Sequence, residues 1–230
     1  MEVLDPIPID LEPTAVEEEL RVRKTGAWGP FQTAFEIVRD SIHARAGYAI
    51  HYVDARSDDG VVIDGIRFGS RVLSINLQHV GRVFPYVVTI GAVLEERIDA
   101  AKDLLSKYYL DAIGNLALIQ ARTYLEEVIR SKFALNGLSF MSPGSLKDWP
   151  IEEQRRLFSL LEGIEQSTGV RLTERCLMIP KKSVSGIYFP SETTFYNCQL
   201  CPRSRCVGRK AAYSEGLARE YGIQEKEGRS

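Results

Sequence analysis

The sequence lacks the features that mark several common classes of protein. Charged residues interrupt every apolar run before it reaches the roughly 18 residues that a membrane-spanning helix needs. The acidic segment 1–19 contains prolines and lacks the basic flank and apolar stretch of a secretory signal. Histidine occurs only three times, and no Ser-His-Asp or Cys-His arrangement is suggested. We therefore expect a cytoplasmic protein, and nothing favours a hydrolase.

An excess of charge of one sign is also lacking. The chain has 29 basic and 31 acidic residues and a formal net charge of −2, so no overall field attracts nucleic acid or an anionic membrane. Glycine-rich phosphate-binding motifs do not occur at the spacing that nucleotide-binding folds require. We expect neither nucleic acid nor a membrane as a partner, and partners must be recognised locally. With 230 residues, 44% of them hydrophobic, the chain can bury a substantial core.

Helical and strand-like patterns alternate irregularly along the chain. Apolar spacing predicts helices at 31–46, 71–78, 92–133, about 150–165 and about 207–221. The run 92–133 is better split in two, at 108–109 or at Gly114. Strands are expected at 48–53, 61–63, 83–90, 171–179 and 185–189, and turn residues 57–60 predict a hairpin between the first two. Without regular β-α-β alternation, we expect an α+β fold with a mixed, largely antiparallel sheet and long helices.

Changes in composition suggest three portions. Residues 1–26 are expected to form an acidic N-terminal extension, and 27–137 a hairpin and long-helix portion. Residues 138–230 differ in character and contain all four cysteines. This last portion either stands alone or forms one continuous domain with 27–137.

Four landmarks follow one another in the last portion. They are Ser142-Pro143-Gly144, a helix containing residues 157–161, the run Thr-Gly-Val-Arg-Leu-Thr-Glu at 168–174 and the run Ser-Val-Ser-Gly-Ile-Tyr-Phe at 183–189. In this order and spacing, the segment resembles the C-terminal part of the activation (reactivation) domain of cobalamin-dependent methionine synthase. The resemblance covers roughly the last third to two-fifths of the chain. It implies the fold of that domain, in a free-standing form.

The resemblance also implies a function. Domains of this family bind S-adenosylmethionine and dock over a corrinoid. One electron and a methyl group from the sulfonium then restore methylcobalamin after cob(II)alamin has formed by oxidation. The chain is therefore expected to be an accessory reactivation factor, without catalytic residues of its own, for a corrinoid-binding methyltransferase protein such as methionine synthase.

The ligand is expected where the Pro-Gly turn meets the Ser-Gly-x-Tyr-Phe segment. Glycines allow close backbone approach to a ligand, and aromatic faces attract a sulfonium cation. These two segments should come together to line one cleft. The candidate ligand-binding residues are Pro143, Gly144, Ser145, Ser185, Gly186, Tyr188 and Tyr196.

Two positions depart from the family's pattern. Better-known members carry an arginine three residues before the proline, which grips the ligand carboxylate, and a tyrosine directly after the glycine. Here these positions hold Phe140 and Ser145. A lysine at 147, 181 or 182 is a candidate to replace the lost charge. The alternative function is a metal- or iron–sulfur-binding interaction module of a corrinoid protein that no longer binds S-adenosylmethionine.

The cysteines predict a metal site. Two cysteines three residues apart at a turn can bind one metal ion, and further cysteines complete a zinc or cluster site. Zinc would be structural, whereas an iron–sulfur cluster, slightly favoured here, could supply the electron; buried reduced thiols are the other possibility. The basic residues around the cluster could offset its charge or meet an acidic partner. The candidate ligands are Cys176, Cys198, Cys201 and Cys206, and the basic residues are Arg203, Arg205, Arg209 and Lys210.

Overall fold

A computed structural model of the chain describes residues 1–192, 195–203 and 209–223. The chain divides into two compact units, each built from three segments. Unit 1 comprises Met1–Tyr48, Val87–Val128 and Gly163–Val184, and unit 2 comprises Ala49–Tyr86, Ile129–Glu162 and Ser185–Ser230. Helix α6 (Leu104–Lys132) and strands β6 (Arg82–Thr89) and β10 (Ser183–Pro190) contribute residues to both units.

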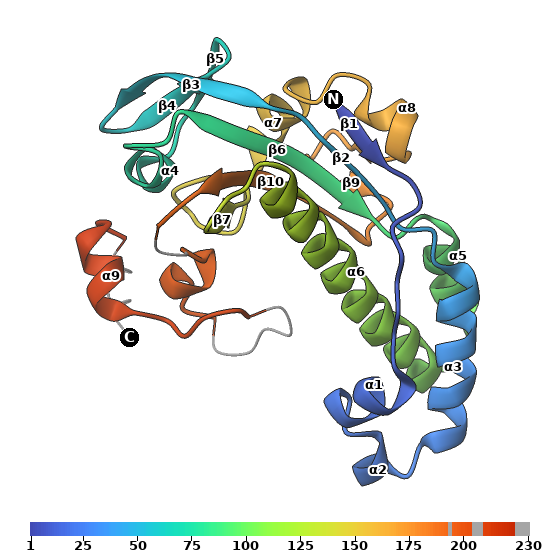
Figure 1. Cartoon of the computed structure of the whole chain (residues 1–230). Coiled ribbons are helices and arrows are strands. Elements are labelled where there is room, and N and C mark those ends of the chain that lie inside the picture. The colour runs from blue at the N-terminus through green and yellow to red at the C-terminus, as the bar shows by residue number, and fades with distance from the viewer. Residues whose placement is uncertain (193–194, 204–208, 224–230) are drawn as a thin grey trace. The chain divides into compact units, whose positions relative to one another are not determined.

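Three helices of unit 1 pack on one another. Helix α3 (Trp28–Ser41) buries Phe31 and the other apolar residues of its three-four spacing. It lies beside α5 (Val93–Ala100) and α6 (Figure 1), where Phe31 meets Tyr109 edge to face with ring centroids 5.8 Å apart. The short helices α1 (Pro13–Glu19) and α2 (Val22–Thr25) precede α3. Unit 1 therefore includes the segment 1–26, of which Ile7, Val16 and Val22 are buried.

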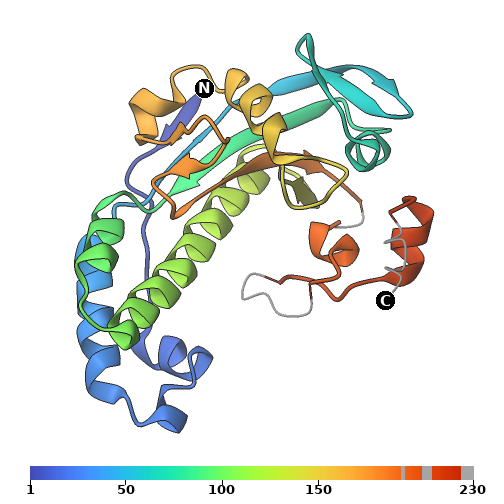
Figure 2. The same cartoon turned by 180° about the vertical axis from the view of Figure 1, so that it is seen from behind.

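The strands of unit 1 lie against a short helix. Strand β1 (Glu2–Leu4) pairs antiparallel with β2 (Arg45–Tyr48), and β8 (Arg171–Leu172) pairs antiparallel with β9 (Met178–Ile179). Helix α8 (Ile164–Thr168) packs on β2 (Figure 2). A Cβ on Gly47 would lie 2.4 Å from Ile164 Cδ1, so any larger residue there would require the Ile164 side chain to shift.

Unit 2 contains the other antiparallel strands. Strand β3 (His51–Ser57) pairs with β4 (Gly60–Ile63) and with β6, and β4 pairs with β5 (Ile66–Phe68). Strand β7 (Leu138–Met141) pairs antiparallel with β10. In the main sheet the strand order is β1-β2-β6-β3-β4-β5, with β10 pairing with β6 and β7. The predicted α+β fold with a largely antiparallel sheet is confirmed.

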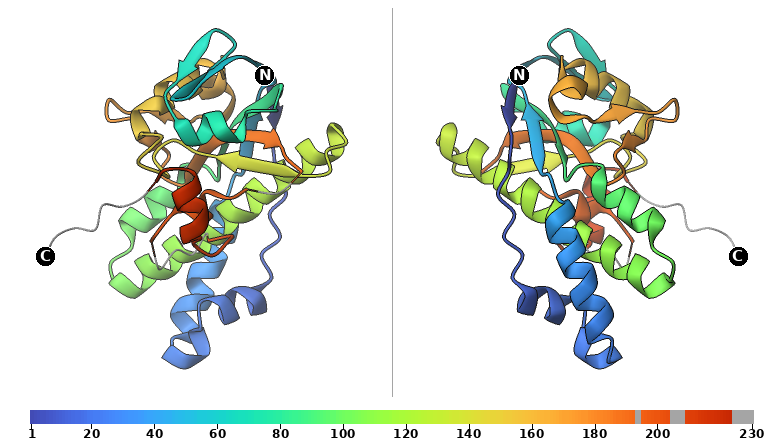
Figure 3. Two further views of the ribbon diagram at one scale, coloured as in Figure 1. Left: turned by 90° about the vertical axis from the view of Figure 1, so that its left-hand side faces the viewer. Right: turned by 90° about the vertical axis from the view of Figure 1, so that its right-hand side faces the viewer.

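Short helices complete unit 2. They are α4 (Arg71–Asn76), the 3₁₀ helix η1 (Ile151–Glu153), α7 (Gln154–Ser159), the 3₁₀ helix η2 (Asn197–Leu200) and α9 (Glu215–Glu220). Helix α9 packs on η2 and lies near α4 (Figure 3). The hydrophobic core of the unit gathers side chains from β4, β5, α4, β7 and β10 around the fully buried Trp149.

Several predicted elements end elsewhere than the sequence suggested. Two helices do replace the run 92–133, but the break lies at 101–103 and not at 108–109 or Gly114. Ala101 is extended, and Asp103 Oδ1 accepts a hydrogen bond from the Ser106 N–H (2.9 Å), which starts a new helix. The same bond lowers the pKa of Asp103. The helix cap at Asp103 therefore sets the boundary between α5 and α6.

The C-terminal third departs more from the predicted elements. The predicted helix at 150–165 is broken, because Gly163 has a φ of +79° between α7 and α8. The predicted strand 171–179 is a hairpin whose turn holds Cys176 at a φ of +60°. Of the predicted helix 207–221, the described residues are helical only from Glu215, after the Ser214 cap. None of the helices described is long and apolar enough to cross a membrane.

The predicted division at residues 26 and 137 stays a prediction. Unit 1 takes segments from all three predicted portions, and unit 2 takes segments from the last two.

Candidate functional site

A closed loop follows β7. The Gly144 N–H donates to Trp149 O (2.7 Å), and the Trp149 N–H donates to Leu146 O (3.1 Å). Gly144 has a φ of +78°, and a Cβ on it would lie 2.8 Å from Ile151 Cδ1. Pro143 is buried, whereas Gly144 itself is exposed. The backbone of this turn is therefore fixed and open to solvent.

The loop is anchored to helix α4. Asp148 Oδ2 accepts hydrogen bonds from Ser70 Oγ (2.5 Å) and from the Val72 N–H (2.9 Å). Ser70 Oγ in turn accepts from the Leu73 N–H (3.0 Å) and caps α4. A carboxylate at the start of a helix also interacts favourably with the helix dipole. Asp148 is a positioning residue that the sequence analysis missed, since its partners lie more than 70 residues away.

The Pro-Gly loop and the Ser-Gly-x-Tyr-Phe segment lie together in unit 2. Ile187 of β10 pairs with Met141 at the end of β7. A Cβ on Gly186 would lie 2.5 Å from Met141 O, 2.7 Å from Ser142 Oγ and 3.0 Å from Tyr86 Oη. The two segments therefore touch, and the predicted cleft between them stays a prediction. The space that glycine leaves at this position is taken by the protein's own atoms.

The neighbouring Ser185 faces the interior. Its side chain is buried, and Ser185 Oγ donates to Gln154 Oε1 (2.8 Å). Ser145, by contrast, is exposed on the loop. Of these two serines, only Ser145 lies open to a ligand in this conformation.

A row of aromatic rings runs away from Gly186. Tyr188 is fully buried and stacks on Tyr86 with centroids 4.2 Å apart. Phe140 meets Tyr188 and Tyr196 with centroid distances of 6.0 Å each, and Phe140 and Tyr196 form a parallel β-bridge. Tyr196 is half-buried, so of the two predicted tyrosines it is the one with exposed surface.

Two candidate metal ligands lie close to each other in unit 2. Cys198 and Cys201 are half-buried, unbridged cysteines at η2, and the Lys210 N–H donates to Cys198 Sγ (3.4 Å). Cys176 is buried in unit 1, and Cys206 lies outside the described residues. Among the residues with described positions, no group of three or more His, Cys, Asp or Glu could hold a metal ion. The predicted metal site stays a prediction.

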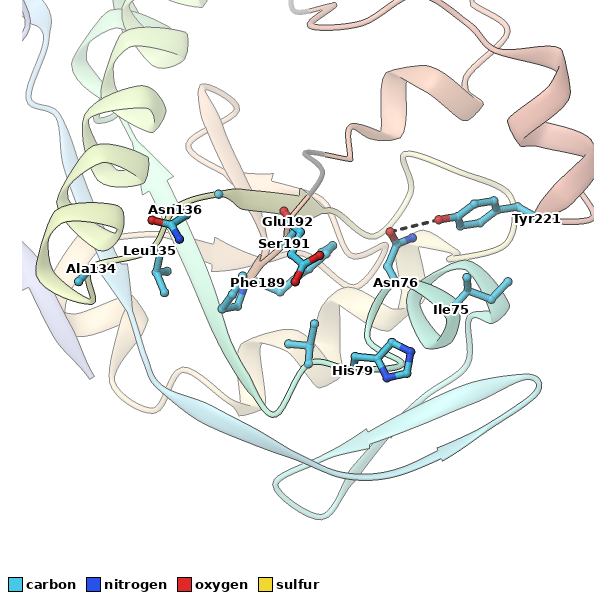
Figure 4. A pocket seen from close by; sticks show the side chains of 13 residues that line it. Ile75, Asn76, His79, Ala134, Leu135, Asn136, Phe189, Ser191, Glu192 and Tyr221 are labelled. Carbon is cyan, nitrogen blue, oxygen red and sulfur yellow. Dashed lines mark hydrogen bonds between the residues drawn. The ribbon is translucent and has the colours of Figure 1, made fainter.

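Unit 2 also contains a pocket of about 700 Å³ that was not expected from the sequence (Figure 4). Tyr221 Oη donates to Asn76 Oδ1 (3.4 Å) on its wall, and burial raises the pKa of Tyr221. The pocket is lined by none of the seven predicted ligand-binding residues, because its wall comes from segments far apart in the chain. The lining residues are Ile75, Asn76, His79, Val80, Ala134, Leu135, Asn136, Gly137, Phe189, Pro190, Ser191, Glu192 and Tyr221.

Comparison with known proteins agrees with the predicted resemblance. Residues 143–206 match the sequence model of the family described as vitamin B12 dependent methionine synthase, activation domain. A crystal structure of the MetH reactivation domain bound to AdoHcy is similar in fold, with a TM-score of 0.59 and 19% sequence identity. The match covers 97% of this chain and 86% of that chain. No curated protein sequence matches the chain.

The family model covers the Pro-Gly loop, both glycines and the tyrosines of the candidate site. The structural match extends over nearly the whole chain, so the likeness in fold includes the segments outside that model. The predicted resemblance is therefore confirmed: the chain has the fold of a reactivation domain, and its residues 143–206 match the vitamin B12-dependent methionine synthase activation domain family.

Proposed function

We propose that this chain binds S-adenosylmethionine beside the loop 142–149 and supports the reactivation of a cobalamin-dependent methyltransferase such as methionine synthase. One observation carries the proposal. Ser142, which directly precedes the matched segment and the exposed turn at Gly144, lies against Gly186 of that segment. The solved reactivation domain of the same fold was crystallised with AdoHcy, the demethylated form of this ligand.

The described residues suit the parts of such a ligand. The exposed backbone at Gly144 and the hydroxyl of Ser145 offer polar contacts at a turn that its own hydrogen bonds hold rigid. The face of Tyr196 offers an attraction of about 0.5–2 kcal/mol to a sulfonium. Tyr188 supports this face indirectly, because it packs against Phe140, which contacts Tyr196.

We propose a corrinoid-binding methyltransferase protein as the partner, with this chain as its accessory reactivation factor. The methyl group would pass from the sulfonium sulfur to the partner's cobalamin, which takes one electron from an external donor, and S-adenosylhomocysteine would remain. The carbon–sulfur bond breaks and a carbon–cobalt bond forms. A cytoplasmic location fits this role and stays a prediction.

Calorimetric titration of the whole chain tests the ligand. We expect saturable one-to-one binding of S-adenosylmethionine and S-adenosylhomocysteine. Because its ring supplies the open aromatic face, Tyr196→Leu should weaken S-adenosylmethionine binding by a factor of about 2–30. Tyr196→Phe should retain most of the affinity.

Tyr213→Leu, at an exposed tyrosine outside the candidate site, is the matched control and should bind as the unaltered chain does. Absence of heat at millimolar ligand would remove the methyl-donor function. The alternative, an interaction module of a corrinoid protein, would then remain.

The cysteine cluster is proposed as a metal or iron–sulfur site in addition. A hydrogen bond from a backbone N–H to a cysteine sulfur stabilises a thiolate, and the Lys210 N–H donates such a bond to Cys198 Sγ. Cys201→Ala is therefore expected to lower bound metal and the melting temperature. Metal analysis and melting of protein prepared without air provide the measurement.

The same preparation identifies the metal. A brown protein with bound iron would indicate a cluster, and a colourless protein with stoichiometric zinc would indicate a structural site. Cys176→Ala tests the fourth ligand separately. Unchanged metal content in Cys201→Ala would show that the ligand assignment is wrong.

A further inference from the structure

The guanidinium of Arg209 joins the backbones of two cysteines in unit 2. Its Nη1 donates to Cys198 O (3.1 Å) and to Ala211 O (3.0 Å). Its Nη2 donates to Cys201 O (3.1 Å) and to Arg203 O. Arginine can make these bonds together because it carries five N–H donors in a rigid planar fork, whereas lysine has three on a single nitrogen. One side chain therefore holds the main chain at both cysteines.

The turn between the two cysteines is fixed in other ways as well. The Cys201 N–H donates to Cys198 O (3.3 Å), which closes the turn at η2. The Ser214 N–H donates to Gln199 O (2.8 Å) and joins the turn to the start of α9. Leu200, inside the turn, is buried in the hydrophobic core of unit 2. A turn held in this way loses less conformational freedom when its side chains bind an ion.

Arg209 also brings a positive charge to the two cysteines. Its four acceptors are neutral carbonyl oxygens, so these bonds do not neutralise the guanidinium. A cation beside a cysteine favours the thiolate, which is the form that binds metal. Both effects of Arg209, on position and on charge, favour a pair of thiolates at Cys198 and Cys201.

We propose that Arg209 is the positioning residue of a metal site, in which it holds Cys198 and Cys201 so that their two thiolates bind one thiophilic metal ion together. The inference rests on the metal site put forward as part of the proposed function, and it names the residue that assembles that site. Replacing a residue that orients metal ligands typically weakens metal binding by about 10–100-fold.

Titration of the metal-free whole chain with Zn²⁺, without air and against a chromophoric chelator, tests the assignment. Arg209→Gln should weaken Zn²⁺ binding by about 10–100-fold. Arg209→Lys keeps the positive charge but has no planar fork, so it should weaken binding nearly as much. Full affinity in Arg209→Lys would show that charge alone matters and would overturn the positioning role.

The rise in melting temperature that Zn²⁺ produces separates metal binding from a general structural role. This rise depends on the affinity for the ion, so it should be smaller in Arg209→Gln than in the unaltered chain, whatever the melting temperature of the metal-free variant. An equal rise would overturn the assignment. If Arg209→Gln does not fold, Arg209→Lys serves for the same comparison.

Arg203→Gln is the matched control. Arg203 is an exposed arginine of the same segment, and the substitution leaves its carbonyl group in place. This variant should bind Zn²⁺ within about twofold of the unaltered chain, because an exposed charge contributes little. A loss equal to that in Arg209→Gln would overturn the assignment.

The outcomes for the residue and for the site are distinguishable. If the unaltered chain binds Zn²⁺ and Arg209→Gln binds it equally well, the role of Arg209 is wrong while the proposed metal site stands. If the unaltered chain prepared without air contains no metal and binds no Zn²⁺, the proposed metal site fails and the assignment falls with it.

Discussion

Gly186→Ala is expected to lower the free energy of unfolding by about 2–3 kcal/mol and to abolish binding of S-adenosylhomocysteine. The added Cβ would lie 2.5 Å from the carbonyl oxygen of Met141. That oxygen belongs to the backbone of β7, the strand paired with β10, so no side-chain rotation can relieve the clash. The two strands must separate, and the contact that joins Gly186 to Ser142 is lost with them. Urea unfolding and calorimetric titration measure the two effects.

Gly216→Ala is the matched control. Nothing lies within 4 Å of a Cβ on Gly216, and the residue is in helix α9. Alanine is favoured over glycine in a helix by about 0.5–1 kcal/mol, so this variant should be as stable as the unaltered chain or more stable. Equal stability of Gly186→Ala and the unaltered chain would contradict the close packing of β7 against β10.

Local signals in the sequence predicted the elements whose determinants are local. The turn at 57–60 is an example: Ser57 pairs with Gly60 across the hairpin, and Ser57 Oγ donates to Asp59 Oδ1 (2.7 Å). Helix α3 is another, since its buried residues follow the predicted spacing. The predicted helix boundaries were wrong where the backbone conformation of a single residue ends or begins a helix, as at Ala101 and Gly163.

The order of the motifs indicated which segments form the candidate site. The positions of their side chains could not be predicted from the sequence. The resemblance placed the Pro-Gly turn and the Ser-Gly-x-Tyr-Phe segment in one site, and the structure brings Gly186 against Ser142. The sequence could not show that Ser185 and Tyr188 face the interior, because burial depends on neighbours such as Gln154 and Tyr86.

Contacts between segments far apart in the chain were not predicted either, because they too depend on neighbours that the fold brings together. Asp148 binds Ser70 across 78 residues, and Lys210 lies over a ring 70 positions earlier in the chain. No periodicity or spacing signals such a contact. The sequence showed which chemical group each side chain carries, whereas only the structure showed which residue it contacts.

Trp149→Ala is expected to cost about 3–5 kcal/mol of stability and to weaken ligand binding. The ring is fully buried and meets Phe68 edge to face, with centroids 6.2 Å apart. The carbonyl of the same residue accepts the Gly144 N–H that closes the loop. Losing the ring should therefore free the turn that carries Gly144.

Trp149→Phe separates packing from hydrogen bonding. The buried Nε1 of Trp149 has no hydrogen-bond partner among the residues that the structure describes. An unpaired buried N–H costs about 1–3 kcal/mol, so its removal offsets part of the lost ring volume. We expect a loss below about 1.5 kcal/mol and unchanged affinity for S-adenosylhomocysteine, measured by urea unfolding and calorimetry. If phenylalanine destabilises the protein as much as alanine does, the indole N–H has a partner, and the loop depends on that bond and not on the volume of the ring.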